Sequence, residues 1–310
     1  MKKTRLVFMG TPAFAVPALS ALHECCEILA AITQPDKPAG RGRKMTAPPV
    51  KVAAQQMGIP VKQPLNLRQR EFITWLEALQ PHYIVTCAYG KILPPAVLAI
   101  PHKAALNIHA SLLPRHRGAA PIHRAIMAGD EESGITIMRM DSGMDTGDIV
   151  LSQAVPIDSN DTAGLLHDKL AALGAELIIV AIKKINKGTA QFQQQDERLA
   201  TYAPPLKKDD EKINWCNTSE AIHNQVRGMN PWPGAYTELN GARLKIWEGQ
   251  PSKQQGHPCG SVLAQSSAGI LVATADGSYL ITKVQPQGKK IMSADAFLRG
   301  RHISLGTVLG

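Results

Sequence analysis

Two polar residues with chemical potential lie close together in the stretch 105–114, which reads ALNIHASLLP. Its first half is rich in apolar residues, as is typical of a buried strand, and Pro114 cannot continue a central ladder. Because strand side chains repeat with period two, Asn107 and His109 project from the same face near the strand's carboxyl end. An amide can donate a hydrogen bond to a carbonyl oxygen that gains charge, while an imidazole transfers a proton. The pair therefore favours acyl transfer over the alternative, a core histidine that bonds only the backbone.

A carboxylate completes the candidate site. Asp145 lies between two glycines in the segment 143–147, which reads GMDTG. Glycines let the backbone approach a ligand closely, and an aspartate beside a histidine can orient its ring. Alone, Asp145 would be interpreted as a turn residue, since aspartate is common in glycine-rich turns. Together with Asn107 and His109 it predicts an active site.

Alternating strands and helices are expected to position these residues. Apolar strands are predicted at 5–9, 27–33, 83–88, 105–110 and 134–140. A helix is expected after the first strand, with Thr11 as N-cap and Pro12 as its first residue. A helix over about 162–186 would end this part of the chain. The alternation predicts an α/β fold, a doubly wound and mostly parallel sheet of Rossmann-like type, although the dinucleotide fingerprint G-x-G-x-x-G is missing.

The length of 310 residues predicts two domains. We expect a catalytic domain over 1–188 and a linker over 189–209, where periodicity is weak and Pro204 and Pro205 are adjacent. The remainder, 210–310, contains short strand patterns separated by glycine-containing turns. Such a pattern favours a small antiparallel β-barrel of OB-like type.

A long basic loop, 34–51, interrupts the first domain. Loops between strands and helices usually have about two to six residues. From residue 37 to 51 it contains no acid and five basic residues, Lys37, Arg41, Arg43, Lys44 and Lys51. It suits a nucleic-acid backbone, although a solvated surface loop is the simpler alternative.

The composition supports a globular protein. Hydrophobic residues make up 44% and charged residues 19% of the chain, with a net charge of +9. This charge fits an anionic partner, although basic charge alone is weak evidence. No apolar run is long enough to span a membrane, and no signal peptide is evident. The five cysteines lack C-x-x-C spacing, so we expect reduced thiols in a cytoplasmic protein and no zinc site.

The motif that runs from Asn107 and His109 into Ser111-Leu-Leu-Pro114, with the later Asp145, resembles the signature of folate-dependent formyltransferases. Further segments resemble the branch of this family that acts on methionyl-tRNA: GTP at 10–12, QPD at 34–36, PAGRG at 38–42, GAAP at 118–121, DTGD at 145–148, NPWP at 230–233 and GKK at 288–290. The resemblance covers essentially the whole chain.

The resemblance implies formyl transfer from 10-formyltetrahydrofolate to the amino group of methionine on initiator tRNA. Asn107 would stabilise the oxyanion, His109 would donate to it or take the amine's proton, and Asp145 would hold His109 and a water. The implied folate contacts are Ser111, Leu112, Leu113 and Pro114. The implied tRNA contacts are Arg41, Arg43 and Lys44 in the loop, with Lys289 and Lys290 in the second domain. We expect neither a metal nor a redox cofactor. We expect the protein to be a monomer.

Three alternatives remain open at this point. The acceptor could be a small amine, such as a glycinamide or amino-sugar nucleotide. A formyltetrahydrofolate hydrolase could use the same three residues with water as acceptor. The chain could also be a tRNA-binding module that retains an inactive site. An assay of formyl transfer to charged initiator and elongator tRNAs separates these possibilities.

Overall fold

The structure is a computed structural model that describes residues 3–39, 42, 44–301 and 303–310. It contains two compact units. The first comprises 1–121, 133–155 and 167–204, and the second comprises 122–132, 156–166 and 205–310. Residues 189–204 therefore belong to the first unit, whereas the sequence suggested a linker there. The segments 122–132 and 156–166, expected in the first domain, cluster with the second.

A seven-stranded sheet forms the first unit, in the order β10-β9-β7-β6-β1-β2-β5. Its strands are β1 (Arg5–Gly10), β2 (Glu27–Ile32), β5 (Val61–Lys62), β6 (Tyr83–Cys87), β7 (Ala104–His109), β9 (Glu132–Arg139) and β10 (Ile149–Pro156). The pairings from β5 through β7 are parallel, and β9 runs antiparallel to β7. The doubly wound, mostly parallel sheet is thus confirmed. The sequence did not predict β10.

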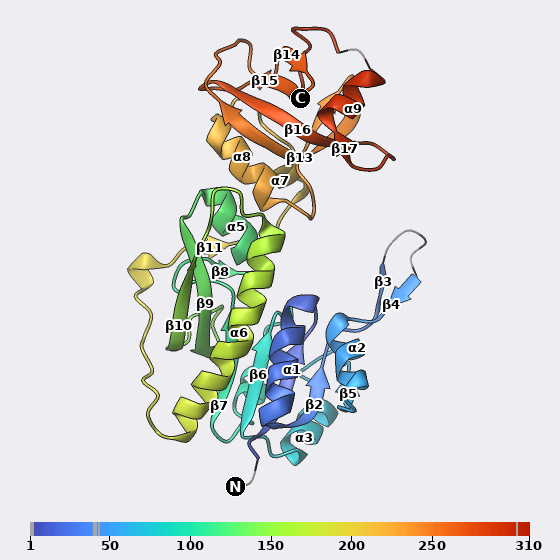
Figure 1. The fold of residues 1–310 in the computed structure, drawn as a ribbon. Helices are drawn as coiled ribbons and strands as arrows, with labels where there is room; N and C mark the ends of the chain where they lie inside the picture. The colour runs from blue at the N-terminus through green and yellow to red at the C-terminus, as the bar shows by residue number, and fades with distance from the viewer. Residues whose placement is uncertain (1–2, 40–41, 43, 302) are drawn as a thin grey trace. The chain divides into compact units, whose positions relative to one another are not determined.

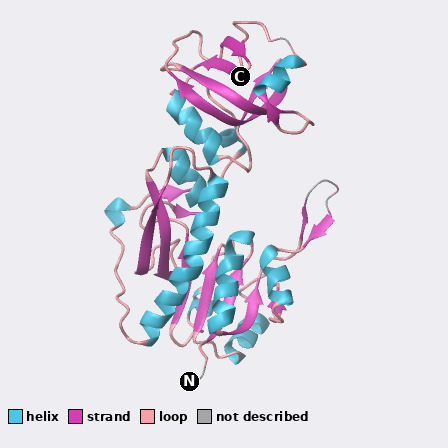
Figure 2. Ribbon diagram, viewed as in Figure 1, coloured by secondary structure: helices cyan, strands magenta, loops and turns pink. Residues whose placement is uncertain are grey.

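Helices cover the sheet, as Figures 1 and 2 show. They are α1 (Val16–Cys25), α2 (Pro49–Gln56), α3 (Arg70–Ala78), α4 (Pro95–Leu98) and α6 (Ala163–Asn186). Helix α5 (Pro121–Ala128) belongs, apart from its first residue, to the second unit. Helix α6 lies close against β7 and β9. A Cβ built on Gly174 would be 2.8 Å from the Ile108 side chain and 3.7 Å from that of Ile135. A side chain there would force α6 away from the strand that carries Asn107 and His109.

The prediction that Thr11 caps the first helix is wrong. A 3₁₀ turn, η1 (Ala13–Ala15), precedes α1, and neither helix has a side-chain cap bond. The Thr11 hydroxyl instead donates to the main-chain carbonyl of Tyr89 at 2.9 Å. Thr11 therefore links the segments that follow β1 and β6. A long-range partner competed successfully with the local cap.

The loop 34–51 contains a short hairpin of β3 (Lys37–Ala39) and β4 (Lys44–Thr46), which projects from the first unit in Figure 1. Arg41 and Arg43 lie outside the described residues. Lys51 is engaged within the protein, because its Nζ donates to both Asp36 oxygens at 2.8 Å and to Gln63 at 2.9 Å. The hydrogen bond from Lys51 holds the pKa of Asp36 below its usual range. This cluster ties the base of the hairpin to α2 and to the loop after β5.

The second unit is the predicted antiparallel, barrel-like domain. The main path of its sheet runs β12-β13-β16-β15-β14, and β17 pairs with β16. The strands are β12 (Tyr236–Leu239), β13 (Ala242–Ser252), β14 (Val262–Ser266), β15 (Gly269–Ala273), β16 (Ser278–Pro286) and β17 (Met292–Ser293), with helices α7 (Lys208–Glu211), α8 (Ser219–Gly228) and α9 (Ala294–Arg299). The sequence patterns at 242–247, 260–264, 270–274 and 279–284 predict strands that overlap β13, β14, β15 and β16, whereas β12 and β17 were not anticipated.

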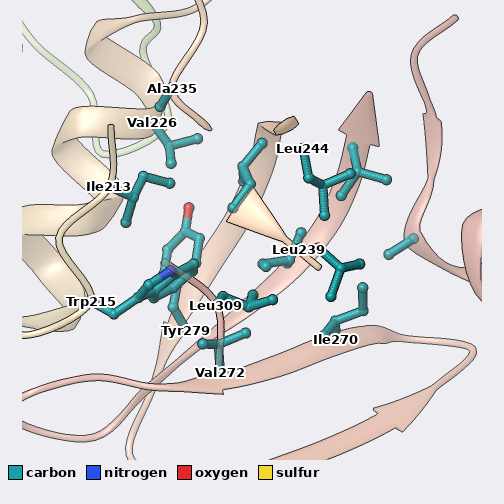
Figure 3. Close-up of a cluster of buried hydrophobic side chains, with 14 of the residues drawn as sticks. Ile213, Trp215, Val226, Ala235, Leu239, Leu244, Ile270, Val272, Tyr279 and Leu309 are labelled. Atoms are coloured by element: carbon teal, nitrogen blue, oxygen red, sulfur yellow. The ribbon is translucent and has the colours of Figure 1, made fainter. Parts of the chain in front are cut away.

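The second unit has its own hydrophobic core, part of which Figure 3 shows. Trp215, Tyr279 and Ile281 are buried in it. The indole nitrogen of Trp215 donates to the Thr237 hydroxyl at 3.0 Å, so this buried polar atom is satisfied. No described helix in the chain has the length and apolar character to cross a membrane.

We predict that Ile281→Ala destabilises the second unit, because Ile281 is fully buried in β16. Truncation of such a side chain usually costs about 2–5 kcal/mol. Thr282→Ala, the half-buried neighbour, is the matched control and should change stability by about 0.5 kcal/mol or less. Urea unfolding followed by tryptophan fluorescence measures both, and equal effects would contradict the assigned core.

Candidate active site

Asn107 is oriented by the neighbouring strand. It pairs in register with Thr86 of β6, and the Thr86 hydroxyl lies 2.8 Å from the Asn107 side-chain oxygen, to which it can donate. Because that oxygen accepts, the Asn107 amide nitrogen is turned toward Asp145, with 3.4 Å between Nδ2 and Oδ1. The arrangement presents an N–H donor at the carboxyl end of the sheet.

His109 lies two residues further along β7 and is buried. Its Nε2 is 3.0 Å from the main-chain oxygen of His116, a distance at which an N–H donates to a carbonyl. Its Nδ1 faces Asp145 Oδ1 at 3.6 Å, too far for a short hydrogen bond but close enough for an ion pair. The carbonyl thus fixes the ring plane, and Nδ1 is the nitrogen directed toward Asp145.

Asp145 adopts the left-handed conformation, with φ at +57°. This conformation costs a residue with a side chain roughly 1–2 kcal/mol, so neighbours must hold it in place. Its Oδ2 accepts a hydrogen bond from the Gly118 amide at 2.9 Å. Gly147 is required nearby, because a Cβ there would collide with the carbonyl oxygen of Arg139. One carboxylate oxygen is therefore fixed, and Oδ1 is the oxygen that faces Asn107 and His109.

A second set of hydrogen bonds holds the main chain around Asp145. The side-chain amide of Gln195 donates to the carbonyls of Asp145 at 2.9 Å and Gly147 at 2.7 Å. The Gln195 oxygen accepts from Arg117 Nε at 3.1 Å and Nη2 at 2.9 Å. Gln195 lies in the segment interpreted as a linker, which therefore contributes to the site.

Arg117 is fully buried and pairs with Glu197, whose side chain is largely exposed, at 2.7 Å. The hydrogen bond from Arg117 holds the pKa of Glu197 below its ordinary value. Because the folded pKa is lowered, the stability that this pair adds is present at neutral pH. It is lost only as the pH falls through that lowered value.

The loop 111–114 is attached to β9. The Thr136 hydroxyl donates to the Ser111 carbonyl at 2.7 Å and accepts from the Leu113 amide at 3.1 Å. The buried Ser111 hydroxyl donates to the Arg115 carbonyl at 2.6 Å. The side chains of Leu112 and Pro114 are only partly buried. The Ser111 side chain therefore stabilises the loop, and the main chain with Leu112 and Pro114 is better placed to meet a ligand.

The predicted cationic contacts lie elsewhere on the chain. Lys44 is exposed in β4, and Lys289 and Lys290 are exposed in the turn between β16 and β17. Among the described residues, no group of three histidine, cysteine, aspartate or glutamate side chains could hold a metal ion.

The structure brings the predicted side chains of Asn107, His109 and Asp145 together, but sequence reasoning missed the residues that hold them. Thr86 had a visible signal, since it is a polar residue inside an otherwise apolar strand pattern. Gln195 had none, because it lies in a segment without periodicity. The geometry as a whole presents two nitrogens and one carboxylate oxygen around a common point. This arrangement can stabilise an oxyanion and accept a proton, as acyl transfer to an amine requires.

Comparison with known proteins agrees with this chemistry. Residues 4–182 match the formyl transferase model, and residues 205–302 match the model of the formyl transferase C-terminal domain. The fold is also similar to that of an N-formyltransferase from Helicobacter canadensis, solved in complex with folinic acid and dTDP-3-aminofucose. The TM-score is 0.65, the identity 22%, and the match covers 92% of this chain and 100% of that one. The family matches thus define the chain as a formyl transferase.

Two curated relatives narrow the family. The methionyl-tRNA formyltransferase of Pelotomaculum thermopropionicum is 49% identical over 99% of this chain and 98% of its own length. That of Bacillus subtilis is 46% identical over 99% and 98%, respectively. The chain belongs to the methionyl-tRNA formyltransferase family. The resemblance noted from the sequence motifs is therefore confirmed.

We predict that Thr86→Val lowers the rate of formyl transfer by about tenfold or more, because a small misplacement of a reacting group costs up to about a hundredfold. Valine keeps the shape of threonine but cannot donate to the Asn107 oxygen. Thr86→Ser is the matched control, since it keeps the hydroxyl and should retain most activity. Steady-state kcat for the three proteins checks this, and equal kcat for Val and Ser would contradict it.

Proposed function

We propose that this protein transfers the formyl group of 10-formyltetrahydrofolate to the free amino group of methionine on initiator Met-tRNA. The product is N-formylmethionyl-tRNA for translation initiation. The observation that carries the proposal is the match to methionyl-tRNA formyltransferases along both parts of the chain, at 49% identity over 99% of it. A cytoplasmic location and a monomeric state stay predictions.

The chemistry assigns a task to each of three side chains. The methionine nitrogen attacks the formyl carbon, and a tetrahedral intermediate with a negatively charged oxygen forms. Asn107 Nδ2 donates to that oxygen, and His109 Nδ1–H is the second donor when it carries a proton. Asp145 Oδ1 accepts the proton of the attacking amine, directly or through a water. The carbon–N10 bond then breaks, and the folate nitrogen takes up a proton.

The folate donor would contact the loop that follows β7. Ser111, Leu112, Leu113 and Pro114 begin two residues after His109, so the loop and the reacting groups share one edge of the sheet. Its attachment to Thr136 supports the proposal, because a fixed loop presents its main chain to a ligand without further ordering.

The tRNA would contact cations outside the site. Lys44 in the hairpin and Lys289 and Lys290 in the second unit are exposed, as a phosphate contact requires. Arg41 and Arg43 complete the proposed set from the same loop. An arginine can stack on an unpaired base as well as bind phosphate, which suits the end of an acceptor stem.

Small-amine acceptors and water are the competing possibilities. The solved N-formyltransferase with dTDP-3-aminofucose shares the fold, so the fold alone does not choose the acceptor. The proposal is tested by incubating the protein with labelled 10-formyltetrahydrofolate and charged initiator or elongator tRNA. We expect formyl-methionine on the initiator. Release of formate without tRNA would favour a hydrolase, and no turnover at all would favour a binding module.

We predict that Asn107→Ala, His109→Ala and Asp145→Ala each lower kcat by about a hundredfold or more, as loss of a donor or base does in other enzymes. Affinity for Met-tRNA should change little, since none of the three is needed to hold RNA. Single-turnover formylation and filter binding measure the two quantities. Near-normal turnover of the Asn107 variant would contradict its assignment as oxyanion donor.

We also predict that Arg41→Ala strongly reduces Met-tRNA formylation while folate binding persists, and that Arg41→Lys restores it poorly because lysine lacks a planar face. Each lost phosphate contact should reduce the salt dependence of binding by about 0.7–0.9 in the log–log slope. Lys187→Ala is the control, because this exposed lysine follows α6, whose last residue contacts Tyr83 at the amino end of β6. Unchanged rate, affinity and slope in Arg41→Ala would leave the loop without a role.

A further inference from the structure

We propose that Gln195 is a positioning residue for the formyl-transfer site, acting through Asp145 and itself held by the buried Arg117. This inference rests on the proposed function, because it assigns a task to a residue of that same site. Gln195 does not reach Asn107 or His109 through any hydrogen bond in the described structure. Its contribution is to the main chain that carries the catalytic carboxylate.

The hydrogen bonds of Gln195 point to this task. The two donor bonds of its amide nitrogen, 2.9 and 2.7 Å long, go to the carbonyls of Asp145 and Gly147. They join both ends of the turn that presents the Asp145 carboxylate. The Gln195 side chain is buried, so water is poorly placed to replace it.

Arg117 holds the Gln195 side chain in place. We call the two hydrogen bonds from Gln195 to the carbonyls of Asp145 and Gly147 the Gln195 clamp. Two of its nitrogens donate to the Gln195 oxygen at 3.1 and 2.9 Å, which fixes which end of the Gln195 amide faces Asp145. The adjoining residue, Gly118, donates its amide to Asp145 Oδ2 at 2.9 Å. Arg117 and Gly118 therefore connect the carboxylate and the main chain of Asp145 to one short strand, β8 (Arg117–Gly118).

The conformation of Asp145 explains why a clamp is needed. At φ +57° it would relax toward an ordinary conformation if it were not restrained. Such a rotation would move Oδ1 away from Asn107 and His109. A displacement of about 1 Å at a reacting group can cost about a hundredfold in rate.

Gln195→Glu tests the clamp with little change of shape. Glutamate can still accept from Arg117, but it replaces the donor that faces the two carbonyls with an oxygen. Gln195→Met removes the donor without adding charge, so agreement between the two variants excludes a purely electrostatic effect. Gln193→Glu is the matched control, because this exposed residue lies on the same segment and undergoes the same change of charge.

We expect kcat for Met-tRNA formylation to fall by about 10- to 100-fold in Gln195→Glu and Gln195→Met, with KM for tRNA and folate nearly unchanged. Gln193→Glu should behave as the wild type. The decisive measurement is the single-turnover rate of formylation by the double variant that combines Gln195→Glu with Asp145→Asn. If Gln195 acts through Asp145, the double variant should be no slower than Asp145→Asn alone.

Two results would overturn the inference. Wild-type kcat in Gln195→Glu would show that the clamp is dispensable, and an undiminished effect in the Asp145→Asn background would assign Gln195 a general structural role. Failure of the wild type to formylate Met-tRNA would instead contradict the proposed function. The same variants, assayed on formyl transfer to another amine or on formate release, would then decide the inference.

Discussion

The hydrogen bond from the Gly118 amide to the Asp145 carboxylate is the contact on which the site depends. It links two segments that are 27 residues apart in the chain and holds a side chain whose backbone is in an unfavourable region. A lone aspartate in a glycine-rich turn would sample many orientations. Here one oxygen is fixed, and the other is available at the point where Asn107 and His109 converge.

The sheet supplies the second half of this geometry. Asn107 and His109 lie on a strand with neighbours on both sides, so the backbone beneath them is fixed by ladder hydrogen bonds. The Thr86 contact then selects which end of the Asn107 amide faces the reacting groups. For a group that donates to a developing oxyanion, this orientation matters as much as position. A reversed Asn107 amide would direct its oxygen, an acceptor like the Asp145 carboxylate, at the reacting groups in place of an N–H donor.

The side chains proposed for catalysis and those proposed for acceptor choice belong to different parts of this architecture. The three proposed catalytic side chains, Asn107, His109 and Asp145, lie in the first unit, and the fold is shared with a formyltransferase crystallised with an amino-sugar nucleotide. The exposed lysines of the hairpin and of the second unit are not among these three side chains. We therefore attribute the proposed preference for tRNA to these additions and the transfer chemistry to the sheet edge.

The sequence by itself determined the local features of this protein. Apolar alternation predicted the central strands, and period two placed Asn107 and His109 on one face, because both follow from backbone geometry alone. The tertiary structure decided which distant groups complete the site. Thr11 became a link to Tyr89 instead of a cap, and Gln195 became part of the site from a segment without periodicity. Gln195 and Asp145 are 50 residues apart, and a hydrogen bond at such separation depends on how the whole chain packs, which no local pattern encodes.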